Sequence, residues 1–230
     1  MQGLSTTAIG HRPLGECIDI YRHLETELKL EYLELAVGTC NSLDIIPDMK
    51  LVLHDRCLFS NKRRIPFSLL RRSTWQEYKQ VIESKEVVLL SIHPPERKMC
   101  SWYDVVRARA ELEDYMQVPV ALEVMPAPHY WCYKEDSLLD IPLCLDISHI
   151  NIWCRGNVDK VKQVIEVLHN NILEVHLSDN NGYVDSHNLI PNDAWFMDVE
   201  WVAPFVTYEA LPARYYKYER MDKQNARSKQ

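Results

Sequence analysis

Short apolar runs alternate with stretches of helical periodicity along most of the chain. Runs of this kind are typical of parallel strands that are buried on both faces and joined by crossover helices. The sequence predicts eight strands: Gln2–Ser5, Tyr32–Ala36, Leu51–His54, Val87–His93, Val120–Val124, Leu143–Asp146, Leu173–Leu177 and Phe205–Glu209. Eight parallel strands with crossovers between them predict an α/β fold, the (β/α)8 or TIM barrel.

Helices are predicted in several of the connecting segments. Thr74 and Glu77 have the spacing of a capping box, so we expect a helix in TWQEYKQVIES. Asn157 precedes a segment whose apolar residues recur every three or four positions, which predicts a capped amphipathic helix. Two further helices are expected over about Leu14–Leu28 and Tyr103–Met116.

Some crossovers are predicted to be shortened, because two connections do not have a helical pattern. Residues 125–140 (MPAPHYWCYKEDSLLD) contain prolines that disfavour a long helix, and residues 178–204 are mostly loop-like. The length of 230 residues is enough for one large core. We therefore expect a single barrel domain over residues 1–212 and a polar C-terminal tail over residues 213–230.

The charge and the cysteines narrow the functional classes. The formal net charge of −7 argues against a general nucleic-acid binder, although the basic stretch with Arg56, Arg63 and Arg64 leaves local anion binding open. The seven cysteines are scattered and never form C-x-x-C, which favours a reducing cytoplasm over a disulfide framework or a thiolate zinc site. The sequence has no export signal and no run of eighteen apolar residues, so we expect no membrane association.

Ionisable residues fall at the carboxyl ends of six predicted strands. These residues are His54, His93, Glu123, Asp146, His176 and Glu209, and the following loops add His149, Asp185 and His187. Because the carboxyl ends of parallel barrel strands share one rim, we expect these side chains to converge on one pocket. Imidazole and carboxylate groups together are the ligands of Zn, Mn or Fe(II), and a metal would offset the gathered negative charge.

Each of these residues also has a structural explanation. A single strand-end histidine such as His54 or His93 is more often a hydrogen-bonded structural residue. Glu123 is harder to explain in this way, because a carboxylate inside an apolar strand normally has a cation or a metal as its partner. The joint placement at strand ends favours one metal site over six coincidences.

The order of these residues resembles that of the xylose-isomerase-like TIM-barrel superfamily. The segments LVLHD, SIHP, LEV, LDISH, EVHLSDNNG, DSH and TYE carry the resemblance, which covers about residues 51–209. The full set of nine resembles the apurinic endonuclease IV group within that superfamily. The glycine-rich stretch that follows Asp-x-His in that group is replaced here by NLIPNDAWF, so DNA is not the expected substrate.

The resemblance implies two or three divalent metals, with Zn, Mn or Fe favoured and Mg as another option. His54, His93 and Glu123 would hold one ion, and Glu123 would bridge to a second. Asp146, His176 and Glu209 would complete that second site, whereas the third ion would use His149, Asp185 and His187. In isomerases and epimerases of the superfamily, residues at the positions of Glu123 and Glu209 also move protons, and one at the position of His149 helps to bind sugar.

Three functions follow as hypotheses. The first is metal-dependent hydrolysis of a small phosphoester such as a sugar phosphate or a nucleotide. The second is isomerisation or epimerisation of a sugar or sugar phosphate at the Glu123, Asp146, His176 and Glu209 site. The third is a non-catalytic metal-binding or maturation protein. Substrate contacts are expected from Arg56, Arg63, Tyr130 and Trp131, and the sequence leaves the oligomeric state open.

Overall fold

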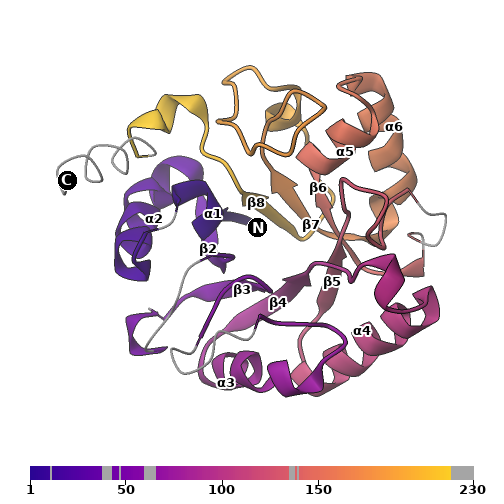
Figure 1. Cartoon of the computed structure of the whole chain (residues 1–230). Coiled ribbons are helices and arrows are strands. Elements are labelled where there is room, and N and C mark those ends of the chain that lie inside the picture. Colours follow the sequence, from indigo (N-terminus) through magenta and orange to yellow (C-terminus); the bar gives the residue numbers. More distant parts are fainter. Residues whose placement is uncertain are drawn as a thin grey trace, which may run out of the picture.

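In the computed structural model, eight parallel strands close into one barrel, which confirms the predicted fold class (Figure 1). The strands are β1 (Gln2–Ser5), β2 (Leu30–Leu35), β3 (Lys50–His54), β4 (Val87–Ile92), β5 (Val120–Glu123), β6 (Leu143–Asp146), β7 (Ile172–Leu177) and β8 (Phe205–Tyr208). Each strand pairs with its neighbour in the chain, and β8 pairs with β1. All eight predicted strands are confirmed to within two residues at either end.

The structure describes residues 1–10, 12–37, 43–46, 48–59, 66–134, 138 and 140–218. The helices surround the barrel in Figure 1. They are α1 (Thr6–Ile9), α2 (Leu14–Leu28), α3 (Gln76–Ser84), α4 (Trp102–Met116), α5 (Ile147–Trp153) and α6 (Val158–Leu168). The predicted helices at residues 14–28 and 103–116 are confirmed. The Asn157 cap is also confirmed, since its side chain accepts a hydrogen bond from the amide of Lys160. None of the described helices combines the length and the apolar character needed to cross a membrane.

The predicted capping box at Thr74 is wrong. The Thr74 hydroxyl donates to the carbonyl of Arg71 at 2.7 Å and accepts from the amide of Ser68 at 3.0 Å, so it stabilises the turn before the helix. Helix α3 consequently begins at Gln76 without a side-chain cap. The capping box of this molecule lies instead at the start of α4, where Ser101 and Asp104 cap each other's amides.

The connections expected to be loops have little regular structure. The described part of residues 124–142 contains no α-helix, and residues 178–204 contain one 3-10 turn, Trp195–Asp198. A further 3-10 turn, Ala213–Tyr215, follows β8, and the Tyr215 side chain is buried. The boundary of the polar tail stays a prediction, because residues 219–230 lie outside the described part of the chain.

Alternation along the strands gives the barrel lumen an apolar floor and a polar upper layer. The floor is one cluster made by Tyr32, Val52, Leu89, Ala121, Cys144 and Phe205. Two residues further along the same strands stand Glu34, His54, Ser91, Glu123, Asp146 and Thr207, all of them buried. Because side chains two positions apart share one face of a strand, the polar groups lie directly above the floor, towards the carboxyl end. This change from apolar to polar positions marks where the candidate site begins.

Candidate metal centre

All nine predicted ligands converge at the carboxyl end of the barrel. Seven of them line one cavity of about 370 Å³, whereas Asp146 and His176 lie below it and have no exposed surface. Neighbouring members are within ion-pair distance of each other from one side of the rim to the other. A larger hollow of about 670 Å³ lies beside α5 and α6, but none of the nine residues lines it.

The ends of β3, β4 and β5 form the first part of the centre, which we call the strand half: His54, His93 and Glu123. The Oε2 atom of Glu123 lies 3.0 Å from Nε2 of His54 and 3.3 Å from Nε2 of His93. Asp55 holds both imidazoles from behind, because its Oδ1 accepts from Nδ1 of His93 at 2.6 Å and lies 3.0 Å from Nδ1 of His54. Both rings therefore present Nε2 towards Glu123 and the cavity.

Asp55 was not among the predicted site residues. It directly follows His54 in the segment LVLHD, so the sequence contained a usable signal. A carboxylate that holds the outer nitrogen of a ligand histidine is common around protein metals, because it fixes the ring's tautomer and orientation.

Asp146 is the last residue of β6 and also the N-cap of helix α5. Its Oδ1 accepts from the amides of Ser148 and His149, which leaves Oδ2 buried without a hydrogen-bond partner among the described residues. The cap sets the position of His149, one turn into the helix, whose Nδ1 donates to the carbonyl of Val124 at 2.6 Å. Nε2 of His149 then lies 3.5 Å from the free Asp146 oxygen.

The remaining residues, which with His149 we call the loop half, are Asp185 and His187 in the β7–β8 connection. Asp185 lies between the two histidines, 3.1 Å from Nε2 of His149 and 3.2 Å from Nε2 of His187. A pair of backbone hydrogen bonds between Asp179 and Asn188 closes this loop. His187 has a positive φ of 40°, a conformation that is uncommon outside glycine.

Asn180 and Gly182 attach the same loop to helix α5. The Asn180 side chain donates to the carbonyl of Ser148 at 2.8 Å and accepts from the amide of Gly182 at 2.8 Å. Gly182 has φ 79°, and a Cβ atom there would lie 2.4 Å from the backbone nitrogen of Gly156. Only glycine fits this close approach. The DNNG segment therefore fixes the position of the Asp-x-His pair.

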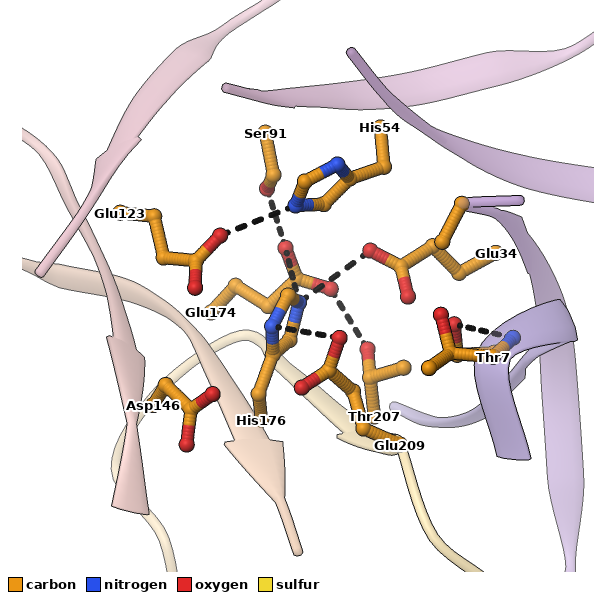
Figure 2. A network of polar contacts seen from close by, with 12 residues as sticks. Thr7, Glu34, His54, Ser91, Glu123, Asp146, Glu174, His176, Thr207 and Glu209 are labelled. Carbon is orange, nitrogen blue, oxygen red and sulfur yellow. Dashed lines mark hydrogen bonds and ion pairs between the residues drawn. The ribbon is translucent and has the colours of Figure 1, made fainter. Parts of the chain in front are cut away.

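Glu209 and His176 complete the centre. The two oxygens of Glu209 lie 3.4 Å from Nδ1 of His176 and 3.4 Å from Nδ1 of His187, so this carboxylate links β7 to the loop half. Two carboxylates that the sequence analysis missed, those of Glu34 and Glu174, lie against Nε2 of His176 (Figure 2). Both stand inside buried strands, the same signal that had drawn attention to Glu123.

The centre holds more negative than positive groups. Seven carboxylates, those of Glu34, Asp55, Glu123, Asp146, Glu174, Asp185 and Glu209, face five histidines. Arg56 is the sole lysine or arginine among the described residues that line the cavity. If every carboxylate is ionised, even protonation of all five histidines together with the Arg56 charge would leave one excess negative charge.

The pKa values reflect this imbalance. Burial lowers the pKa of His149, but the carboxylates of Asp146 and Asp185 outweigh it and raise this pKa to about 10. The pKa of His187 rises to about 9 for the same reason, with Asp185 and Glu209 as the partners that overcome burial. Burial raises the pKa of Asp146 to about 6, even though His149 opposes the shift. Without a metal, His149 and His187 would therefore hold protons as substitute cations.

These residues fit divalent metal ions. Several buried ligand atoms have no hydrogen-bond partner among the described residues, including Oδ2 of Asp146, Oε2 of Glu209 and both ring nitrogens of His176. Five groups of three residues have ligand atoms within 4.8 Å of one another. Three of them contain predicted ligands around the cavity: His54 with Asp55 and His93, Glu123 with Asp146 and His176, and Asp146 with His149 and His187. Nitrogen and oxygen donors together suit Zn, Mn or Fe.

The expected substrate contacts separate into three cases. Arg56 and Tyr130 line the cavity. Trp131 lies outside it, where the indole donates to the carbonyl of Cys100 and packs against Trp102 and Arg97. Arg63 is not among the described residues, so its predicted contact lies outside the part of the chain that the structure describes.

No protein-family model matches this sequence, and no curated protein matches it either. Solved structures do match. A D-tagatose 3-epimerase-like protein shares 18% identity at a TM-score of 0.59 and covers 97% of this chain and 96% of its own. The IolI protein with a bound zinc atom shares 16% identity at a TM-score of 0.56, and the match covers 99% of this chain and 96% of IolI. Endonuclease IV from Thermus thermophilus shares 11% identity at a TM-score of 0.55, and the match covers 100% of this chain and 99% of the endonuclease.

The chain shares the TIM-barrel fold of these solved structures. The fold that the sequence resemblance implied is thereby confirmed over nearly the whole chain. At these identities the likeness extends to the fold alone, and the similar structures include both an epimerase-like protein and an endonuclease. The reaction therefore has to be argued from the residues of this chain.

Proposed function

We propose that this chain is a divalent-metal-dependent hydrolase of a small phosphoester, with a multinuclear centre. The observation that carries this proposal is the position of His54 and His93. Both present Nε2 to the same oxygen of Glu123, a carboxylate whose other oxygen lies 3.2 Å from Nδ1 of His149. A single-metal isomerase site has no need of these two histidines, whereas a centre with a bridging carboxylate does.

Divalent metals held here would generate a hydroxide near neutral pH and neutralise charge on the phosphoryl oxygens. The protein residues have separate tasks. Asp55 keeps His54 and His93 oriented, so that both rings are ready to bind without rearrangement. Val124 does the same for His149 through its carbonyl. No protein nucleophile is required.

The cavity favours a small anionic substrate. Its volume of about 370 Å³ accommodates a sugar phosphate or a nucleotide, and Arg56 lines it beside the strand half. A guanidinium can bind a phosphate with two parallel hydrogen bonds. Tyr130 forms part of the wall and offers an aromatic face to a sugar ring or a base. The net charge of −7 makes duplex DNA a poor substrate.

The test is a panel of sugar phosphates and nucleotides assayed with metal-loaded and chelator-treated protein. We expect turnover that disappears with the chelator and returns with Zn or Mn. The Arg56→Ala variant should raise KM by about 10-fold with little change in kcat, because a charge-assisted hydrogen bond contributes about 1.5 kcal/mol or more to binding. Arg22→Ala is the matched control, an exposed arginine on α2. An unchanged KM for Arg56→Ala would refute the phosphate contact.

Isomerisation or epimerisation of a sugar is the second candidate. Glu123, Asp146, His176 and Glu209 are the four residues that such a reaction requires by resemblance, and the two glutamates would exchange protons at neighbouring carbons. The epimerase-like protein among the similar structures favours this candidate. It predicts one exchangeable Mn or Mg per chain, together with metal-dependent uptake of deuterium from solvent at a sugar carbon.

Two further results would favour other functions over hydrolysis of a small phosphoester. Bound metal without turnover of any phosphoester or sugar would favour a non-catalytic metal-binding or maturation protein. Incision of a duplex with one abasic site would contradict our choice of a small substrate.

A further inference from the structure

His176 lies between a predicted metal ligand, Glu209, and two buried carboxylates outside the predicted ligand set, Glu34 and Glu174. Its ring is fully buried on β7, and Nδ1 faces Glu209 at 3.4 Å. Nε2 points the other way, 3.2 Å from Oε1 of Glu34 and 3.4 Å from Oε2 of Glu174 (Figure 2). The imidazole therefore has carboxylates on both sides, and only one side belongs to the predicted ligand set.

Glu174 and Glu34 differ in whether their carboxylate oxygens have hydrogen-bond partners. Glu174 accepts hydrogen bonds from the hydroxyls of Ser91 and Thr207, and the Thr207 hydroxyl also bonds to Tyr32 at 2.6 Å. It is part of a complete network inside the barrel. Glu34 is fully buried as well, yet neither of its oxygens has a hydrogen-bond partner among the described residues. Its contact with Nε2 of His176 is the ion pair that explains its position.

A buried carboxylate without hydrogen bonds destabilises the folded protein. We therefore expect Glu34 to have a role that offsets the cost of its burial. The other ligand histidines suggest the task. Nδ1 of His93 donates to Asp55, and Nδ1 of His149 donates to the carbonyl of Val124. In each case the nitrogen that faces away from the centre has a fixed acceptor. Glu34 occupies the equivalent place for His176.

We propose that Glu34 is a positioning residue for His176. Its oxygen, 3.2 Å from Nε2, favours the tautomer that carries the hydrogen on that nitrogen and thereby leaves the Nδ1 lone pair free to bind a metal. A neutral imidazole has one N–H and one lone pair, so the acceptor at Nε2 decides which nitrogen can bind a metal. This inference rests on the metal centre of the proposed function but not on the reaction catalysed there.

A different task for Glu34 would be direct ligation. Glu34, His54 and His176 have ligand atoms within 4.8 Å of one another, so an ion deeper in the barrel is geometrically conceivable. That ion would need the Nε2 lone pair of His176 while the upper site uses Nδ1. Neutral imidazole cannot supply both lone pairs. The positioning role therefore agrees better with the chemistry of the ring.

The experiment compares the full-length Glu34→Leu, Glu34→Gln and Glu174→Gln variants with the wild type. Zinc affinity is measured by competition with a chromophoric chelator, and unfolding temperature is measured on metal-free protein. We expect Glu34→Leu to weaken zinc binding by roughly 10- to 100-fold. Its metal-free form should unfold at a lower temperature than the wild type, because protonated His176 loses one of its buried counter-charges. The zinc affinity of Glu34→Gln should lie between those of the wild type and Glu34→Leu, since the amide oxygen of glutamine can still face the Nε2 hydrogen.

Glu174→Gln is the matched control, a change of the same residue type in the same layer. It should lower the unfolding temperature of the metal-free protein, because it disturbs the bonds from Ser91 and Thr207, and it should affect zinc affinity less. A cobalt-substituted sample adds a spectroscopic readout. The visible absorption bands of the bound cobalt should shift in Glu34→Leu and remain close to those of the wild type in Glu174→Gln.

Wild-type zinc affinity in Glu34→Leu and Glu34→Gln would overturn the inference. Loss of one metal per chain while the ion at His176 stays bound at wild-type affinity would also overturn it, because Glu34 would then be a ligand of a separate ion. Both readouts are independent of turnover. A protein that binds zinc as described and hydrolyses no phosphoester would refute the proposed function and leave the role of Glu34 intact.

Discussion

The strand half and the loop half of the centre use the same residue types in different settings. In the strand half, His54 and Glu123 are almost fully buried, and Asp55 fixes the outer nitrogens of both histidines. In the loop half, the side chains of Asp185 and His187 keep 36% and 30% of their surface exposed. Ligands on strand ends are held by the barrel itself, whereas ligands on a loop depend on local hydrogen bonds. We therefore expect tight binding in the strand half and easier exchange in the loop half.

The largest effect is expected from Glu123→Gln, because Glu123 contacts both halves. One of its oxygens faces His54 and His93, and the other faces His149. This variant should lose bound metal and activity together, by more than the roughly 100-fold that loss of an outer-sphere partner can cause. Elemental analysis and the activity assay measure both quantities. Full metal content in Glu123→Gln would contradict the assignment of Glu123 as a bridge.

The next prediction separates the halves directly. His93→Ala should weaken the tightest zinc site, since His93 lies in the strand half. His187→Ala should remove only the most exchangeable ion, since its ring is partly exposed on the loop. Stepwise removal of metal with increasing chelator distinguishes the two variants. If His187→Ala affected the tightest site and His93→Ala the weakest, the order of the halves would be reversed.

A smaller effect is expected from Asp55→Asn. The amide can still accept one hydrogen bond, but it removes the negative charge behind His54 and His93. Zinc affinity of the strand half should fall by about 10-fold, and the loop half should be unaffected. Isothermal titration of zinc into metal-free protein measures the separate sites. An equal loss in both halves would indicate a general structural defect.

The last prediction is a pH dependence of stability without metal. The folded-state pKa of His149 is raised to about 10 and that of His187 to about 9, above the unfolded value of about 6.5. Their contribution to stability is therefore fully present below pH 6.5 and is lost as the pH rises through 9 and 10. Metal binding displaces the same protons, so metal affinity should rise over this window. Calorimetry with and without chelator should give opposite trends, and parallel trends would contradict this prediction.

The sequence predicted the barrel and the side chains that converge at its carboxyl end; that these side chains bind metal stays a prediction. The apolar runs mark all eight strands, and the chemistry-bearing residues stand at their ends, where the topology requires them to meet. Parallel strands that are buried on both faces lack a clear alternation, so the sequence does not reveal which side chains enter the lumen. Glu34 and Glu174 were missed for this reason, although Glu174 is two residues from His176 and therefore shares its face.

Other differences arise from tertiary contacts that no local pattern contains. The Thr74 hydroxyl bonds to the preceding turn instead of capping α3. Tyr130 and Trp131 are adjacent in sequence, yet the first lines the cavity and the second packs against Arg97 and Trp102. The backbone places the side chains of Tyr130 and Trp131 on different sides, so only Tyr130 faces the cavity.

The metal content of the purified wild-type protein tests the central claim most directly. Elemental analysis should find at least two tightly bound Zn, Mn or Fe ions per chain, and mild chelation should remove the ion of the loop half before the others. A protein that binds no divalent metal, or a single ion that leaves His54 and His93 unaffected, would contradict a multinuclear centre.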